Sequence, residues 1–293
     1  DLKDGSIDEL IARSRKVINA KKKDLELIPA RIDELSRQIS NEDACRCVTE
    51  ALEVGYTHID TANAYENEVG VGKAIKASGI ARENLFITTK VPAERKCYDC
   101  AMKSIEESYK NLGLDYIDLL LIHAPKPWDE MHGGSPKKYL AENGEVWKAL
   151  CEAKKNGWVK HIGVSNFNIE DLQNLFDHST EIPEANQIRV HVGHVPDQII
   201  DFCNKNGIVV EAYSPNATGR LLKHPVLTEI AQAHNVTVTQ AAIKFDMQLG
   251  LLPLPKTTHK EFMIQNSSMD FALSIEEMNR LLAIKDDEQN KLP

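Results

Sequence analysis

The sequence of 293 residues has little of what marks a membrane, secreted or nucleic-acid-binding protein. It contains no apolar run approaching the roughly 18–20 residues that a helix needs to cross a bilayer. Residues 1–5 have neither the basic nor the apolar region of a secretory signal. Acidic residues also outnumber basic ones, since 35 Lys and Arg against 44 Asp and Glu give a net charge of −9. Because phosphate contacts require clustered Lys and Arg, we expect a cytoplasmic protein that binds neither nucleic acid nor an anionic membrane.

Cysteine is not abundant enough to indicate a disulfide-rich secreted scaffold. The six cysteines are Cys45, Cys47, Cys97, Cys100, Cys151 and Cys203. Six cysteines in a chain of this size indicate reduced thiols in a cytosolic protein. Cys45 and Cys47 together with Cys97 and Cys100 could form a four-thiolate zinc site. Because Cys45 and Cys47 lie two residues apart in a predicted helix, their side chains diverge, and we expect no metal site.

The apolar residues that are present, within a hydrophobic share of 42%, fall into a regular pattern. Seven short runs rich in Val, Ile and Leu predict buried strands. These runs cover residues 57–60, 85–90, 117–123, 161–166, 185–191, 208–213 and 251–255. Between them, apolar residues recur three and four positions apart, as on amphipathic helices. The alternation predicts an α/β fold with a parallel sheet covered by helices.

An open doubly wound sheet and a closed eight-stranded barrel both fit this alternation. No Gly-x-Gly-x-x-Gly turn follows any predicted strand, which disfavours the dinucleotide-binding open sheet. Polar residues recur at the carboxyl end of nearly every strand: Asp60, Lys90, His123, Ser165, Asn166, Gln187, Tyr213, Ser214 and Lys256. In a barrel these ends meet at one rim, where barrel active sites lie. We therefore predict a (β/α)8 TIM barrel.

Four ionisable residues lie at or just after the ends of three successive predicted strands: Asp60, Tyr65, Lys90 and His123. A tyrosine is a poor acid, with a reference pKa of about 10, but an adjacent lysine cation favours the phenolate and lowers that pKa. A carboxylate behind the lysine keeps the amine charged, and a neutral imidazole can orient a substrate oxygen. Singly, each residue has a structural explanation as a cap, an ion pair or a packing residue. Together they could protonate a carbonyl oxygen, provided that a partner delivers hydride to the carbonyl carbon.

Six motifs occur in a characteristic order. They are residues 55–62 (GYTHIDTA) with Tyr65-Glu66-Asn67-Glu68, 114–119 (LDYIDL) leading to His123, 162–167 (IGVSNF), 185–187 (ANQ), 212–215 (AYSP) and 254–256 (LPK). This set resembles the aldo-keto reductase superfamily, including its carbonyl and aldehyde reductases and 2,5-diketogluconate reductases. The resemblance covers about residues 40–285. It implies a (β/α)8 barrel that binds a nicotinamide cofactor without a Rossmann domain.

The resemblance also implies roles for single residues. Tyr65 would be the general acid, Lys90 and Asp60 would tune it, and His123 would orient a small-molecule carbonyl substrate. The implied cofactor residues are Ser165, Asn166 and Gln187 for the carboxamide, Tyr213 under the nicotinamide ring, Ser214 and Asn216 for the pyrophosphate, Lys256 and Thr257 for the 2′-phosphate or ribose, and Asn266 for adenine. Trp128, in the long segment after His123, is our candidate for an apolar wall of the substrate pocket.

Two departures from the family pattern affect these expectations. Phe262 stands six residues after Lys256, where the family carries an arginine that grips the 2′-phosphate. A flat apolar ring cannot form that bidentate contact, so we expect NADPH as the donor with NADH as an alternative. The second departure is residues 7–38, whose charged, helix-like sequence replaces the family's opening hairpin and first strand.

We interpret residues 7–38 as an engineered or rearranged helical segment within a single barrel domain spanning residues 1–293. Alternatively, residues 24–28 supply a makeshift first strand, limited by Pro29. Two functions follow. The first is NAD(P)H-dependent reduction of aldehydes or ketones to alcohols by a monomeric enzyme. The second is a catalytically impaired or silent scaffold, which the altered N-terminus and Phe262 would favour and the intact set of four ionisable residues disfavours.

Overall fold

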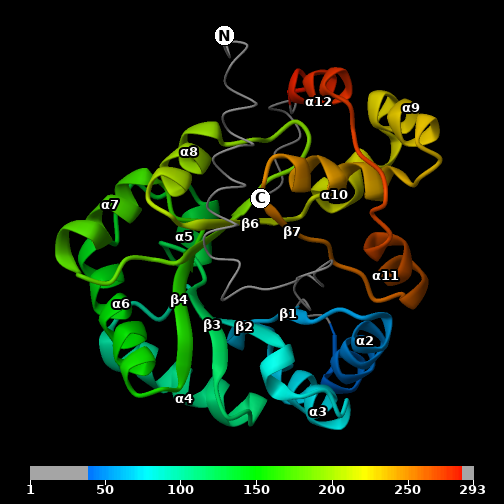
Figure 1. Cartoon of the computed structure of the whole chain (residues 1–293). Helices are drawn as coiled ribbons and strands as arrows, with labels where there is room; N and C mark the ends of the chain where they lie inside the picture. Colours follow the sequence, from blue (N-terminus) through cyan, green and yellow to red (C-terminus); the bar gives the residue numbers. More distant parts are fainter. Residues whose placement is uncertain (1–38, 286–293) are drawn as a thin grey trace. The chain divides into compact units, whose positions relative to one another are not determined.

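The computed structural model describes residues 39–285 (Figure 1). The helical segment predicted at residues 7–38 and the alternative strand at 24–28 lie outside these residues. The described chain divides into two compact units, an N-terminal unit of residues 39–186 and a C-terminal unit of residues 187–285. The assignment of residues 1–293 to a single domain stays a prediction.

All seven predicted strands are confirmed, with some ends shifted by a few residues. The strands are β1 (His58–Asp60), β2 (Phe86–Val91), β3 (Ile117–Ile122), β4 (Val159–Ser165), β5 (Ala185–Arg189), β6 (Val209–Tyr213) and β7 (Leu252–Leu254). In the N-terminal unit β1 to β4 pair in parallel and in sequence order, and in the C-terminal unit β6 pairs with β7 in parallel. Every residue of β3 is buried, as expected of a parallel strand with both faces covered.

Helices alternate with these strands as the apolar spacing predicts. In the N-terminal unit they are α2 (Asn41–Val54), η1 (Asn63–Tyr65), α3 (Glu68–Ala77), η2 (Arg82–Asn84), α4 (Tyr98–Leu112), α5 (Trp128–His132), α6 (Leu140–Lys155) and α7 (Ile169–His178). In the C-terminal unit they are α8 (Asp197–Lys205), η3 (Ala217–Lys223), α9 (Pro225–Ala233), α10 (Val238–Gln248), α11 (Lys260–Ser267) and α12 (Ile275–Leu282). Figure 1 shows α6 alongside β4 and α2 alongside α3. None of these helices is long and apolar enough to cross a membrane.

Local sequence explains several helix ends and one close packing. Ser40 and Asn168 cap α2 and α7 by accepting hydrogen bonds from backbone N–H groups in the first turn. Within α3, a Cβ atom on Gly70 would overlap the carbonyl of Asn41, and one on Gly72 would overlap that of Leu112. These glycines therefore allow α2 and α4 to pack closely on α3.

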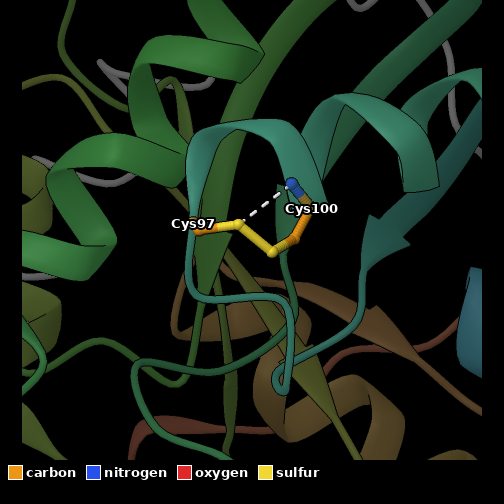
Figure 2. The surroundings of a disulfide bond; sticks show 2 residues. All are labelled: Cys97 and Cys100. Carbon is orange, nitrogen blue, oxygen red and sulfur yellow. Dashed lines mark hydrogen bonds between the residues drawn. A yellow bond between two sulfur atoms is a disulfide. The ribbon is translucent and has the colours of Figure 1, made fainter.

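The expectation that all six cysteines are reduced is wrong for Cys97 and Cys100, which form a disulfide (Figure 2). The two residues lie three apart at the start of α4, which brings their Cα atoms to 5.2 Å, a normal separation for a disulfide. The other four cysteines are thiols. Within residues 39–285, no group of three or more His, Cys, Asp or Glu side chains has an arrangement that could hold a metal ion.

A charged cluster beside β4 predicts a pH-dependent contribution to stability. The Glu184 carboxylate lies 2.7 Å from Nδ1 of His161 and accepts a hydrogen bond from Nζ of Lys154 at 3.1 Å. Burial acts to raise the pKa of Glu184, but the hydrogen bonds and charges of His161 and Lys154 lower it to about 2. Since the ordinary value is 4.5, the stabilisation is complete above pH 4.5 and is lost as the pH falls through 2.

We expect Glu184→Gln to lower the free energy of unfolding by about 1–2 kcal/mol at neutral pH, after allowance for solvent screening. The difference in free energy of unfolding between the wild type and this variant should shrink steadily below pH 4.5, the ordinary pKa of a glutamate. Urea unfolding at a series of pH values measures this difference. Glu145→Gln is the control, because Glu145 pairs with Lys148 on the exposed surface and should contribute little at any pH. A deficit at Glu184 that is independent of pH would contradict the electrostatic explanation.

Candidate active site

The carboxyl ends of β1, β2 and β3 bring the four ionisable residues of the sequence analysis together within the N-terminal unit. Asp60 is the last residue of β1, Lys90 lies near the end of β2, and His123 directly follows β3. Tyr65 comes from η1, which follows β1. Because parallel strands end at the same edge, three strand ends and one short helix suffice to assemble the cluster.

Lys90 and Asp60 form a fully buried ion pair. Neither side chain has solvent exposure, and Nζ of Lys90 donates to Oδ1 of Asp60 and, at 2.9 Å, to the carbonyl of Thr61. Charges without access to water must be paired and hydrogen-bonded to persist. The pair therefore keeps a cation at the end of β2.

Tyr65 and His123 lie next to this pair. Oη of Tyr65 is 3.2 Å from Nε2 of His123, and the two rings meet edge to face with centroids 5.6 Å apart. Nζ of Lys90 lies 5.5 Å from the centroid of the Tyr65 ring. Both Tyr65 and His123 are 6% exposed, so a substrate would meet them with little competing water. A phenol, an imidazole and a buried cation thus share one site.

Glu68 anchors the start of α3, just after the short helix that carries Tyr65, a role that the sequence alone does not reveal. The carboxylate is 1% exposed and accepts hydrogen bonds from Oγ1 of Thr89 at 2.6 Å and from Nδ2 of Asn111 at 3.1 Å. Burial raises the pKa of Glu68, whereas these hydrogen bonds lower it, and the first effect is larger. Because Thr89 precedes Lys90, Glu68 ties the start of α3 to the strand that carries the cation. A lone glutamate at a helix start gives no sequence signal for such a contact.

Ser165 and Asn166 follow His123 in space, at the end of β4. Asn166 adopts the left-handed backbone conformation, with φ of 62°, which asparagine tolerates better than most residues. Its Nδ2 donates to the carbonyl of His123 at 3.1 Å and to Oγ of Ser165 at 3.0 Å. The turn therefore holds two polar side chains beside His123.

Trp128 opens the short helix α5 in the segment after β3. Its ring meets the His123 ring edge to face, with centroids 5.2 Å apart and an interplanar angle of 89°. The His132 ring stacks on Trp128 at 5.7 Å. The structure thus places Trp128 against His123, while its role as a wall of the substrate pocket stays a prediction.

The remaining predicted residues belong to the C-terminal unit. Gln187 is buried in β5 and donates from Nε2 to Oε2 of Glu211 at 2.8 Å. Tyr213 ends β6, and Ser214 after it has a left-handed backbone with φ of 56°. Asn266 is 4% exposed, Lys256 and Phe262 are exposed, and Thr257 accepts a hydrogen bond from the N–H of His259. Their roles toward a cofactor stay predictions.

Comparison with known proteins shows which protein family contains this arrangement of residues. The model of the Aldo/keto reductase family matches residues 30–286. A protein named glyoxal reductase from Bacillus subtilis is 39% identical over 251 residues, covering 85% of this chain and 86% of the relative. The crystal structure of an aldo/keto reductase from Brucella melitensis is 38% identical with a TM-score of 0.77, covering 86% and 93% of the two chains. This chain belongs to the aldo/keto reductase family.

Family membership confirms the predicted architecture and the enzyme class. The fold is the (β/α)8 TIM barrel of the aldo/keto reductase type, and the protein is an oxidoreductase. A Bombyx mori aldo-keto reductase in complex with NADP is 34% identical, with a TM-score of 0.77 and coverage of 87% of this chain and 88% of that one. Aldo/keto reductases use a nicotinamide dinucleotide.

The residues of this aldo/keto reductase fit such a cofactor in their chemistry. Oδ1 of Asn216 is buried and has no hydrogen-bond partner within residues 39–285, although its residue is only half-buried. An unsatisfied buried acceptor of this kind is unusual in a native protein and points to a ligand or ordered water. The hydroxyl and amide groups of Ser165 and Asn166 supply the donors and acceptors that a carboxamide requires.

Proposed function

We propose that the protein reduces small aldehydes and α-dicarbonyl compounds to alcohols with NADPH, with Tyr65 as the general acid. The observation that carries the proposal is the 3.2 Å contact between Oη of Tyr65 and Nε2 of His123, beside the buried pair of Lys90 and Asp60. The substrate class draws on the relative named glyoxal reductase. The cofactor draws on the relative in complex with NADP.

A reduced nicotinamide, when bound, supplies hydride to the carbonyl carbon. Negative charge then develops on the carbonyl oxygen, and Tyr65 donates its phenolic proton to that oxygen. Nε2 of His123 lies close enough to Tyr65 to hydrogen-bond the same oxygen and fix its position. The phenolate left behind is stabilised by the Lys90 cation, which the Asp60 carboxylate keeps charged.

We propose that Ser165 and Asn166 in the N-terminal unit bind the nicotinamide carboxamide. In the C-terminal unit we assign Gln187 to the carboxamide, Tyr213 to the ring, Ser214 and Asn216 to the pyrophosphate, Lys256 and Thr257 to the 2′-phosphate or ribose, and Asn266 to adenine. Trp128 forms an apolar wall of the substrate pocket, supported by its contact with the His123 ring. We further propose a cytoplasmic monomer, which size-exclusion chromatography with light scattering would test for the oligomeric state.

A deuterium-transfer assay tests the reaction. The protein is incubated with NADPH deuterated at nicotinamide C4 and with glyoxal, methylglyoxal or a simple aldehyde, and the alcohol is analysed by mass spectrometry. We expect one deuterium on the former carbonyl carbon and oxidation of one NADPH per alcohol formed. Binding of NADPH without turnover of any carbonyl in the panel would instead support the silent scaffold.

Phe262 bears on the choice between NADPH and NADH. Its ring is 45% exposed on α11 and meets the His259 ring edge to face. A phenylalanine at this position offers no guanidinium to a 2′-phosphate. We expect Phe262→Arg to tighten NADPH binding about tenfold through charge-assisted hydrogen bonds to the 2′-phosphate, and to leave NADH binding unchanged. Quenching of intrinsic fluorescence measures both dissociation constants.

The matched control is Ile264→Arg, which adds the same charge to a similarly exposed position of the same helix. If Ile264→Arg tightens NADPH binding as much as Phe262→Arg does, the gain is a general effect of charge. The role of position 262 in cofactor choice is then refuted.

A further inference from the structure

The Cys97–Cys100 disulfide lies at the N-terminus of α4, in the segment that follows the strand of Lys90 (Figure 2). Cys97 is the capping residue of this 15-residue helix, and its Sγ accepts the backbone N–H of Cys100 at 3.1 Å. Both cysteines are only half-buried, so a small thiol can reach them. A Cys-x-x-Cys pair at a helix start is the arrangement in which one thiolate is stabilised by helix N–H groups.

The residues just before Cys97 hold the segment that follows His123. Nζ of Lys96 donates to the carbonyl of Ala124 at 2.7 Å and to Oδ1 of Asn143 at 2.8 Å. Asn143 in turn donates from Nδ2 to the carbonyl of Pro125 at 3.0 Å. One lysine, adjacent to the disulfide, therefore positions the two residues that come directly after His123.

A second contact runs from the same loop, residues 92–97, to the aromatic wall. Oε1 of Glu94 accepts the backbone N–H of Trp128 at 3.5 Å, and the Trp128 ring packs on His123. Loop 92–97 thus contacts the segment after β3 on both sides of Pro125. Through Glu94, the conformation of this loop bears on the position of Trp128.

Burial also changes the charge state of Lys96 at this position. Burial lowers the pKa of Lys96 to about 7, and the opposing charges of Glu94, Asp171 and Glu142 only partly compensate. At neutral pH a large fraction of Lys96 is therefore the neutral amine, which donates to Ala124 and Asn143 less strongly than an ammonium would. The covalent bond at Cys97 restricts the loop at the residue next to Lys96.

We propose that Cys97 and Cys100 form a redox-active site that exchanges with small thiols and disulfides, and that its oxidation state determines how firmly loop 92–97 holds the substrate wall beside His123. The exchange chemistry is independent of the proposed carbonyl reduction, whereas the effect on turnover rests on it. In the cytoplasm, where we propose that the protein resides, a disulfide is most often of this exchanging kind.

Oxidation of the cysteine pair takes two thiol–disulfide exchange steps. In oxidation, the Cys97 thiolate attacks a sulfur of a low-molecular-weight disulfide such as oxidised glutathione, which breaks that S–S bond and expels one glutathione thiolate. The Cys100 thiolate then attacks Sγ of Cys97, forming the protein disulfide and expelling the second thiolate. The protein loses two electrons and two protons, and the glutathione disulfide gains them. Reduction by a dithiol is the reverse sequence.

Trapping experiments test the exchange without any activity measurement. We expect Cys100→Ser, incubated with oxidised glutathione, to gain one glutathione that peptide mass spectrometry places on Cys97. Cys97→Ser should react far more slowly at Cys100, because Cys100 lacks the capping position. Cys45 and Cys151 are the internal controls, since both are half-buried thiols outside this pair. Labelling of all half-buried cysteines at one rate, or no labelling at Cys97, would overturn the assignment.

Kinetics with glyoxal test the coupling to the substrate wall. We expect the dithiothreitol-reduced protein to show a KM about fivefold above that of the oxidised protein, the lower end of typical couplings, with kcat little changed. The Cys97→Ser/Cys100→Ser double variant should resemble the reduced protein in either buffer. Lys96→Met should remove the difference between redox states while the disulfide still forms, as differential alkylation would show.

The outcomes separate the two proposals. Equal KM values for the oxidised and reduced wild type would refute the coupling, whatever the trapping shows. A redox effect that persists in Lys96→Met would refute the positioning role of Lys96. If neither redox state reduces any carbonyl, the proposed function fails and so does the coupling that rests on it, while the trapping result still decides whether the cysteines exchange.

Discussion

We expect Tyr65→Phe to lower kcat/KM for carbonyl reduction by about 10²–10⁴-fold, the usual contribution of a positioned general acid. The substitution removes only the hydroxyl whose oxygen lies 3.2 Å from Nε2 of His123. Because the ring remains, packing and the dissociation constant for NADPH should change little. Steady-state kinetics with a fixed aldehyde, together with fluorescence titration of NADPH, measure both quantities.

Tyr109→Phe is the matched control. Its hydroxyl also makes one hydrogen bond, to the carbonyl of Asp115 at 3.0 Å, but lies at the surface away from the candidate site. We expect wild-type kinetics from this variant. If Tyr65→Phe keeps more than about a tenth of the wild-type kcat/KM, water or another residue supplies the proton, and the assignment of Tyr65 as general acid fails.

Lys90→Met should have two separable effects. Removal of the cation leaves the Asp60 carboxylate buried without its partner, and breaking such a pair costs about 3–5 kcal/mol of folding stability. Turnover should fall as well, because the Tyr65 phenolate loses the charge that stabilises it. Urea unfolding measures the first effect, and kcat measured well below the unfolding transition measures the second.

The Asp60→Asn/Lys90→Met double variant distinguishes the two effects. Removing both charges should restore most of the stability lost in Lys90→Met without restoring turnover. Arg82→Met is a control for stability alone, since Arg82 and Asp118 form another largely buried pair in the same unit. That variant should unfold more easily and retain kcat. A double variant that recovers turnover would show that Lys90 acts only through stability.

Much of the architecture was predictable because its signals are local. The continuous apolar run that forms β3 and the helix cap at Asn168 each lie within a few residues of sequence. The catalytic candidates were predictable for a related reason. In parallel strands, a polar residue at a carboxyl end reaches a common rim wherever the strand stands in the chain. Asp60, Lys90 and His123 can therefore be grouped from their positions at strand ends, without knowledge of any loop conformation.

The disulfide shows where this reasoning fails. The Cys-x-x-Cys spacing was visible, but the expectation of reduced thiols came from the overall character of the protein rather than from local geometry. A helix start places residues three apart on the same side, which is sufficient for Cys97 and Cys100 to bond. Composition supports an expectation about the compartment, but it does not show whether two particular sulfur atoms meet.

The sequence by itself determined the family, the order of strands and helices, and the four ionisable residues of the candidate site. Only the tertiary structure decided what supports that site. Lys96 reaches a carbonyl 28 residues away, and Glu68 reaches a hydroxyl 21 residues away. Contacts of this kind depend on how loops and helix ends settle against neighbouring strands, and no periodicity or spacing encodes that arrangement. Along a strand, the direction of successive side chains follows the regular repeat of the backbone and can be read from the sequence. The position of a side chain that joins two loops depends instead on the packing of the whole unit.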